Sequence, residues 1–408
     1  MSTHERIPVH VLPGLVIAQL LGAALWFSSS AALPSLMRAW SLSPQDIGLL
    51  VSSVQAGFIV GTFTFALTNL ADRFAAGRVF CASALVGAGA NLVFAYGAVG
   101  LGSALVSRFV TGVALAGIYP VGMKIVVSWS PQTVGRSLGW LVGALTLGTG
   151  LPFLTAFVGA EWPWQLVLAS ASGAAVISGL AVLAIGSGPH LLPARRMDLR
   201  MMLRVFSIAD YRGAALGYFG HMWELYAFWV LAPLLMAAAL TPLGLHQAGW
   251  VNLGAFGIFL AGALGCVLGG TISLHRGSRR VAAWSLAVSG SLCVLGPLLL
   301  WLSPWLLLGA LMVWGALVVS DSPQFSAMSS RACPPDFVAT ALTIQNCIGF
   351  AITIASIELT TRLWAVWGPY VTWLLAPGPL LGLVLLLHPR NRGVTALEHA
   401  RPAPQAGT

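Results

Sequence analysis

The chain has 408 residues, of which 58% are hydrophobic and only 8% are charged, and its formal net charge is +9. No soluble protein of this length needs so apolar a composition to build a core, so a soluble class is excluded. The positive charge would indicate a nucleic-acid partner only if it gathered on one folded face, and the polar connectors are too short to provide one.

A helix needs about 20 predominantly apolar residues to cross a hydrocarbon core of about 30 Å. Twelve such runs follow one another along the chain, at 12–36, 46–68, 78–98, 101–128, 135–158, 164–186, 213–239, 246–272, 281–301, 304–328, 336–360 and 364–387. None of them alternates as a barrel strand does. We therefore expect an all-α polytopic membrane protein with twelve transmembrane helices.

Two local patterns within these runs predict details of the helices. Ser43, Pro44 and Asp46 form a capping pattern at the start of the second helix. The fifth run contains four clustered glycines, which predict close helix packing: Gly139, Gly143, Gly148 and Gly150.

The distribution of basic residues fixes an expected orientation. If the N-terminus lies in the cytoplasm, every Lys and Arg except Arg38, Arg108 and Arg362 falls in a cytoplasmic loop, tail or adjoining helix end. This is the positive-inside bias, so we expect both termini in the cytoplasm.

Short patterns repeat about half a chain apart. Ala24-Leu25-Trp26 is echoed by Ala227-Phe228-Trp229, and Pro120 by Pro323. Repeats of this period indicate two similar halves that face each other, as in many transporters. The expected division is an N-terminal six-helix bundle at 1–186, a cytoplasmic inter-domain loop at 187–212, a C-terminal six-helix bundle at 213–388 and a cytoplasmic tail at 389–408.

The junction between the second and third runs reads Thr68-Asn69-Leu70-Ala71-Asp72-Arg73-Phe74-Ala75-Ala76-Gly77-Arg78. It resembles the G-x-L-A-D-R-x-G-R-R motif of the major facilitator superfamily, with Thr68 and Ala75 at the two glycine positions. A second partial copy, Gly270–Arg280, keeps glycines and arginines but has Leu274 in place of the acid.

This resemblance covers the whole chain, and the fourth run adds to it, because Arg108 followed by Gly112 and Gly117 is similar to the second motif of that superfamily. It implies two pseudo-symmetric six-helix bundles that rock around a central cavity lined by helices 1, 4, 7 and 10. It also implies a charge network that closes the cytoplasmic face, for which the candidates are Asp72, Arg73, Arg78, Arg279 and Arg280. The alternative is that these charges only anchor the positive-inside orientation.

The cavity-lining helices supply the candidate substrate-binding residues, which are Arg108, Trp26, Ser28, Ser29, Tyr119, Trp223 and Gln324, with Ser30 beside them. Arg108 lies about 10 Å to the outer side of the midplane at 1.5 Å rise per residue. An arginine at that depth is costly unless it finds partners. It can bind an anionic substrate directly, or it can pair within the protein. Lys124 is expected to snorkel to the interface without a role in the site.

Three ionisable residues in the second half are the candidates for proton coupling. Glu224 lies about at the bilayer centre, His221 is three residues away on the same helix face, and Asp321 lies at a similar depth just before Pro323. We expect Glu224 to be the principal proton carrier and Asp321 the second, with His221 tuning Glu224. The alternatives are that Glu224 and His221 brace the bundle by bonding each other, or that the three residues bind a divalent metal.

The sequence therefore predicts a proton-coupled secondary transporter of the bacterial inner membrane, acting as a monomer. Its expected partners are a small-molecule substrate, protons and the lipid bilayer, with no nucleic acid and no cofactor besides the proton gradient. The leading hypothesis is symport of a small organic anion, and the alternative is a proton-driven antiporter that exports drugs or other amphipathic compounds. A solute sensor and a polytopic membrane enzyme are further alternatives, although an enzyme has no need of two alternating halves.

Overall fold

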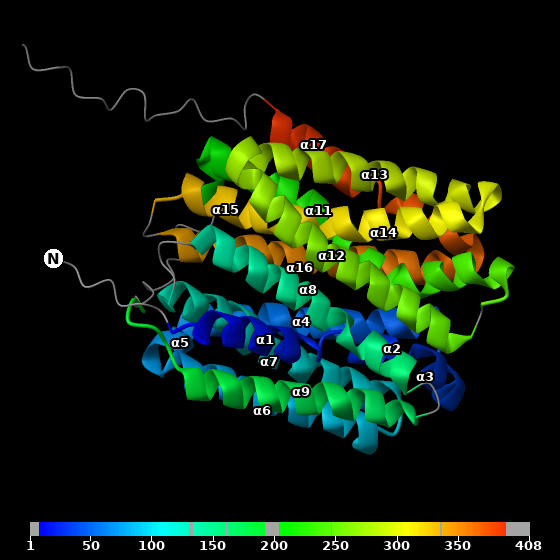
Figure 1. Cartoon of the computed structure of the whole chain (residues 1–408), viewed down its shortest axis with the longest axis horizontal. Coiled ribbons are helices and arrows are strands. Elements are labelled where there is room, and N and C mark those ends of the chain that lie inside the picture. Colours follow the sequence, from blue (N-terminus) through cyan, green and yellow to red (C-terminus); the bar gives the residue numbers. More distant parts are fainter. Residues whose placement is uncertain are drawn as a thin grey trace, which may run out of the picture.

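A computed structural model shows the two halves of the chain as two helical bundles that lie against each other (Figure 1). It describes residues 8–129, 134–159, 162–191, 204–245, 247–334 and 337–388. Residues 192–203 of the predicted connector and the predicted tail 389–408 lie outside the described residues. All regular structure in the described ranges is helical, and they contain no strand. The predicted all-α class is confirmed.

The first half of the chain supplies the lower bundle in Figure 1. Its elements are α1 (Val11–Ala23), α2 (Ser28–Ala31), α3 (Leu33–Trp40), α4 (Pro44–Thr68), α5 (Leu70–Arg73), α6 (Ala76–Gly97), α7 (Leu101–Trp129), α8 (Val134–Val158) and α9 (Trp164–Ile185). Within this bundle α7 packs against both α4 and α6, and α9 packs against α6 and α1.

The second half supplies the upper bundle. Its elements are η2 (Val205–Ser207), α11 (Ala209–Leu240), η3 (Thr241–Leu243), α12 (Ala248–Arg276), α13 (Ser278–Leu302), α14 (Pro304–Ser320), α15 (Ser322–Ala332), α16 (Val338–Trp367), η5 (Gly368–Leu374) and α17 (Pro377–Leu387). Two helix pairs join the bundles, because α8 packs against α12 and α4 packs against α16.

Ten helical segments among the described residues are long and apolar enough to cross a membrane. The last of them, Val338–Leu387, has 50 residues. It contains two of the predicted runs, which correspond to α16 and α17 with η5 between them. The first predicted run is covered by α1, which has only 13 residues, together with α2 and α3. Every one of the twelve predicted runs is therefore helical, and the chain is a multi-pass membrane protein.

The prediction of one continuous helix over 12–36 is wrong. α1 ends at Ala23, and the helix resumes only at Ser28. Ser28 gives a physical reason, since a serine hydroxyl can bond a nearby backbone group and compete with the helix. Here the Ser28 hydroxyl donates to the carbonyl of Leu25 at 3.2 Å. A second interruption lies beside Pro323, because α14 ends at Ser320 and α15 begins at Ser322.

Local sequence patterns also set helix starts and contacts. The capping pattern before α4 is confirmed, since the Ser43 N–H donates to Asp46 Oδ2 at 2.7 Å and the Asp46 N–H donates back to Ser43 Oγ at 3.4 Å. The glycines of α8 allow close packing at several points. For example, a Cβ atom added to Gly143 would lie 3.2 Å from the carbonyl oxygen of Ala263 on α12. Gly139 differs, because an added Cβ would meet nothing within 4 Å.

The two ends of the bundles differ in charge. Exposed arginines gather where α4 and α12 end, at the left in Figure 1, and they include Arg73, Arg78, Arg276 and Arg280. We call this the basic end, and we call the other one the opposite end. In the orientation expected from the positive-inside bias, the basic end is the cytoplasmic one.

Candidate functional site

Arg108 of α7 is fully buried and lies at the interruption between α1 and α2. Its Nη1 donates to the carbonyl of Leu25 at 3.0 Å, and its Nη2 donates to the carbonyl of Trp26 at 2.5 Å. Nη1 also donates to Ser28 Oγ at 3.2 Å and to Asn91 Oδ1 at 3.1 Å. Every one of these partners belongs to the first half of the chain. The geometry therefore matches the second predicted role, pairing within the protein, and Asn91 is a partner that the sequence did not indicate.

A cluster of aromatic rings lies between the two halves. It consists of Trp26, Phe27, Phe58 and Phe153 from the first half and Tyr226, Trp229, Phe259 and Phe350 from the second. The ring centroids of Trp26 and Tyr226 are 5.7 Å apart, and those of Phe27 and Trp229 are 6.1 Å apart. We call this set the aromatic cluster. Its rings join the two bundles at their centre, where the resemblance implied a cavity.

Several buried polar atoms in and beside the aromatic cluster have no hydrogen-bond partner among the described residues. They include the indole nitrogens of Trp26 and Trp229 and the hydroxyls of Ser29 and Ser30. The two tryptophans occupy equivalent positions of the sequence repeat, and both contact Tyr226, at 5.7 and 5.2 Å between centroids. An indole N–H can only donate, and a buried unpaired donor costs free energy. These two groups are therefore suited to an acceptor on a bound molecule.

His221 of α11 pairs with Asp321, at the interruption between α14 and α15. Nδ1 of the histidine lies 2.9 Å from Oδ1 of the aspartate, and each side chain is only 1% exposed. Nε2 of His221 has no partner in the part of the chain that the structure describes. We expected His221 to act on Glu224. The structure instead pairs it with Asp321.

Glu224 points into the interior of the second half. Its carboxylate accepts hydrogen bonds from the hydroxyl of Ser289 at 2.8 Å and from the indole of Trp314 at 2.6 Å. The thiol of Cys293 donates a third, at 3.4 Å. These donors come from α13 and α14, and nothing in those apolar runs marked them as partners. Among the described residues, no group of three His, Cys, Asp or Glu side chains is arranged to hold a metal ion.

The remaining predicted binding residues lie in three different settings. Tyr119 is half-buried on α7 and packs against the core that contains the aromatic cluster. Gln324 is buried in the first turn of α15, where its N–H donates to the carbonyl of Asp321 at 2.9 Å. Trp223 lies apart, because its indole donates to the carbonyl of Leu374 in η5 at 2.9 Å.

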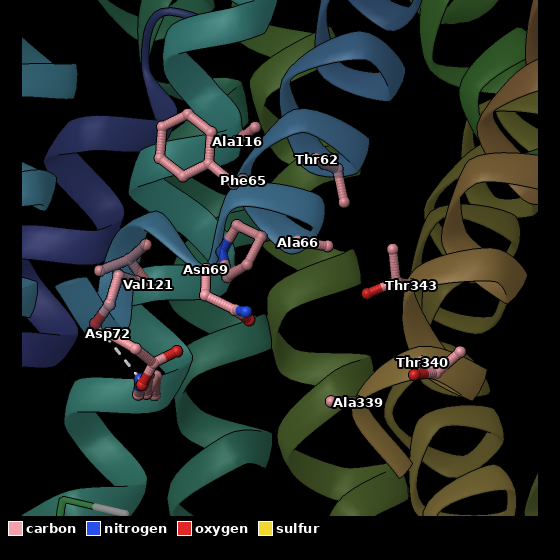
Figure 2. A pocket seen from close by; sticks show the side chains of 13 residues that line it. Thr62, Phe65, Ala66, Asn69, Asp72, Ala116, Val121, Ala339, Thr340 and Thr343 are labelled. Atoms are coloured by element: carbon pink, nitrogen blue, oxygen red, sulfur yellow. Dashed lines mark hydrogen bonds and ion pairs between the residues drawn. The ribbon is translucent and has the colours of Figure 1, made fainter. Parts of the chain in front are cut away.

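A cleft of about 170 Å³ separates the two halves at the basic end (Figure 2). Thr62 of α4 lines one side, and Thr340 and Thr343 of α16 line the other. Lys124 of α7 also lines the cleft, and its ammonium group forms an ion pair with Asp72. This ion pair was not predicted, and it links Lys124 to Asp72, a candidate for the charge network at this end.

The predicted arginines at the basic end have different surroundings. Arg73, Arg78 and Arg280 are exposed. Arg279 donates to Asp210 Oδ1 of α11 at 3.3 Å. The second motif copy lacks its own acid, and Asp210 provides a carboxylate from another helix in its place.

The two halves are in tight contact near the opposite end, along α4 and α16. Ser52 of α4 donates to Glu358 Oε1 of α16 at 2.8 Å, and Arg362 Nε lies 3.6 Å from the other oxygen of this carboxylate. One turn away, a Cβ atom added to Gly48 would lie 3.1 Å from the Cβ of Thr361. We call this contact the outer seam. It was not predicted from the sequence.

Comparison with known proteins agrees with this architecture. Residues 15–200 match the family model of the Major Facilitator Superfamily. The fold is similar to that of the proton:xylose symporter XylE, with a TM-score of 0.72 and 13% sequence identity, over 92% of this chain and 95% of that one. Residues 15–200 thus match the major facilitator superfamily, and the fold of the chain is similar to that of a solved member of it.

Two curated transporters resemble parts of the chain. The putative uncharacterized transporter YgaY of Escherichia coli (strain K12) is 28% identical over 213 residues, which are 50% of this chain and 51% of YgaY. The niacin transporter NiaP of Acinetobacter baylyi is 34% identical over 121 residues, 27% of each chain. The match thus spans about half the length of YgaY and about a quarter of NiaP.

Proposed function

We propose that this protein is a proton-coupled secondary transporter that moves a small organic solute across the bacterial inner membrane by alternating access. The observation that carries the proposal is the aromatic cluster between the halves, with the unpartnered indole donors of Trp26 and Trp229. A molecule held there would contact both bundles at once. Its affinity would therefore depend on how the bundles are oriented, as coupling requires.

The state of the two ends supports alternating access. The outer seam closes one end through the bond between Ser52 and Glu358, while the cleft beside Thr62 and Thr340 separates the halves at the basic end. A transporter that faces the cytoplasm has this asymmetry. The outward-facing state would require the outer seam to separate and the cleft to close.

The unpartnered donors favour a substrate that carries hydrogen-bond acceptors. A small organic anion with a planar group fits this chemistry, since its carboxylate would accept from an indole N–H and its plane would stack on the rings. The partial likeness to the niacin transporter NiaP supports the same class. In this proposal Arg108 does not touch the substrate, because both of its terminal nitrogens bond partners of its own bundle.

Among the buried acids, the pair of Asp321 and His221 is the better proton carrier. It lies at the interruption between α14 and α15, and Nε2 of the histidine is unpartnered among the described residues. Glu224 instead accepts hydrogen bonds from three side chains of α13 and α14, which hold its carboxylate in place. We assign Asp321 the principal role in proton transfer and Glu224 a supporting one.

Export of amphipathic cations by antiport is the second candidate. The observation that favours it is the same aromatic cluster, because the faces of Trp and Tyr rings attract organic cations. The two candidates differ in the direction of proton movement that the solute drives.

Proton movement in proteoliposomes with a trapped pH dye tests the proposal. Panels of organic anions and of cationic amphipaths would be applied to wild type, Asp321→Asn and Glu224→Gln. Entry of protons with an anion, lost in Asp321→Asn, supports symport, whereas proton movement in the opposite sense with a cation supports antiport. No response from folded wild-type protein to either panel would contradict coupled transport.

One matched pair of variants tests the binding site. Trp229→Phe keeps an aromatic ring in the cluster but removes the unpartnered N–H, so it should weaken substrate binding about 5- to 30-fold. Trp305→Phe is the control, because this ring is 66% exposed at the periphery. If both variants bound substrate equally tightly, the indole donor would not be part of the binding site.

A further inference from the structure

A second cavity lies outside the interface between the halves. It is a groove of about 940 Å³ between α12, α13 and α14. Leu268, Ile272 and Trp284 line it and are 61, 50 and 74% exposed. Because these segments span the membrane, side chains exposed on them face lipid. The groove therefore opens sideways into the bilayer.

Basic side chains line the same groove where it reaches the basic end. His275 and Arg276 end α12, and Arg280 lies in the first turn of α13. All three are exposed, and none forms an ion pair in the described part of the chain. Trp284 follows one turn after Arg280, and indole rings are enriched at the boundary between headgroups and acyl chains. The groove thus has a cationic mouth and an apolar interior.

The length of the groove matches one leaflet of a bilayer. Its lining on α12 extends from Arg276 to Gly265, which is about 16 Å at 1.5 Å rise per residue. Half of a hydrocarbon core of about 30 Å is nearly the same distance. A soluble anion would need only the mouth, whereas the full groove suits an acyl chain that hangs from a headgroup.

We propose that this groove binds one anionic phospholipid of the leaflet at the basic end. The phosphate lies between Arg276 and Arg280, with His275 beside it, and one acyl chain lies along Leu268 and Ile272. Charge complementarity selects the headgroup, since each arginine near an anionic surface strengthens binding about 5-fold. The exposed apolar walls select a lipid over a soluble phosphate. The inference does not depend on which solute is transported.

The deep end of the groove lies close to the proposed proton site. Ser285 and Ser320 line it there, and their hydroxyls are 2.5 Å apart. Ser320 is the last residue of α14 and directly precedes Asp321. An acyl chain in the groove would restrict the helix interruption that holds this aspartate.

Lipid titration of the purified full-length protein in detergent, followed by native mass spectrometry, tests the site. The probes are dioleoyl phosphatidylglycerol, dioleoyl phosphatidylcholine and glycerol phosphate. We expect wild type to retain one phosphatidylglycerol at least tenfold more tightly than phosphatidylcholine, and to retain glycerol phosphate weakly. Equal retention of the two lipids would overturn the headgroup assignment, and tight retention of glycerol phosphate would overturn the acyl-chain assignment.

Two variants and a matched control locate the lipid. Arg276→Gln with Arg280→Gln should weaken phosphatidylglycerol about 5-fold per charge, and about 30-fold together. Leu268→Trp fills the groove and should weaken both lipids. Arg73→Gln with Arg78→Gln removes the same charge from the same end and should leave the preference unchanged. Equal losses in both double variants would mean unspecific attraction and would overturn the proposal, as would full retention in Leu268→Trp.

Discussion

Replacing Arg108 by methionine removes the guanidinium from the interruption in the first helix and keeps an unbranched, shorter side chain. The carbonyls of Trp26 and Leu25 lose their bonds at 2.5 and 3.0 Å, whereas the 2.9 Å bond from Ser28 to Asn91 remains. A hydrogen bond from a charged donor contributes about 1.5–3 kcal/mol, and removing a buried charge offsets part of the loss. We expect the free energy of unfolding to fall by about 3 kcal/mol, which is more than a hundredfold in the folding equilibrium.

Reversible unfolding in mixed detergent micelles, followed by tryptophan fluorescence, measures this loss. Arg38→Met is the control, because Arg38 is exposed in α3 and should change stability by less than about 0.5 kcal/mol. Arg108→Lys keeps the charge but loses the forked geometry, so it should be intermediate. Folded Arg108→Met should still bind the transported solute within threefold of wild type. Unchanged stability together with lost binding would refute the reasoning and make Arg108 a substrate ligand.

Three further perturbations have defined outcomes. Ser52→Ala removes the hydrogen bond to Glu358, which is worth about 1.5–3 kcal/mol. Spin labels placed across the outer seam should therefore show a larger open fraction. An unchanged distance distribution would contradict this. Gly112→Ala places a Cβ against a backbone carbonyl of α4 and should lower stability in thermal unfolding by about 1–3 kcal/mol. Gly89→Ala is the control and should leave stability unchanged, because its Cβ would meet nothing within 4 Å. Equal effects of the two variants would count against close packing. Burial raises the pKa of the Cys333 thiol to about 11. The rate of its labelling by maleimide, obtained by comparison with Cys333→Ser, should therefore rise about tenfold per pH unit between pH 8 and 10. A rate that does not change with pH would contradict this.

The signals that predicted the fold are local and strong. The length of each apolar run is dictated by the thickness of the bilayer, so all twelve runs could be read without knowing how the helices pack. The interruption before Pro323 was predictable for a similar reason, because a proline removes a backbone donor and clashes with the preceding turn. Its counterpart Pro120 shows the limit of this rule, since it lies inside a continuous α7.

The partners of the buried charges were not predictable. His221 and Glu224 are three residues apart, which leaves them about 60° apart around the helix axis at 3.6 residues per turn. That difference is enough to direct one toward Asp321 and the other toward Ser289 and Trp314. Which neighbour each one meets depends on the rotation of three other helices, and the sequence of α11 contains no information about it.

The aromatic cluster was only half anticipated. Trp26 and Trp229 emerged from the sequence repeat, but Phe58, Phe259 and Phe350 lie on helices that the family resemblance does not place at the cavity. A phenylalanine in an apolar transmembrane run is indistinguishable by composition from one that faces lipid. Only the packing of α4, α12 and α16 across the interface identifies these rings.

The interruption in the first helix has a consequence for biosynthesis. Carbonyl groups released from a helix in hydrocarbon cost several kcal/mol each until they find a donor. The donor for the Trp26 carbonyl is Arg108, which is synthesised 82 residues later. The first transmembrane segment therefore cannot reach its lowest-energy environment when it leaves the ribosome. It must be shielded, by the insertion machinery or by neighbouring segments, until α7 arrives and the N-terminal bundle closes around the guanidinium.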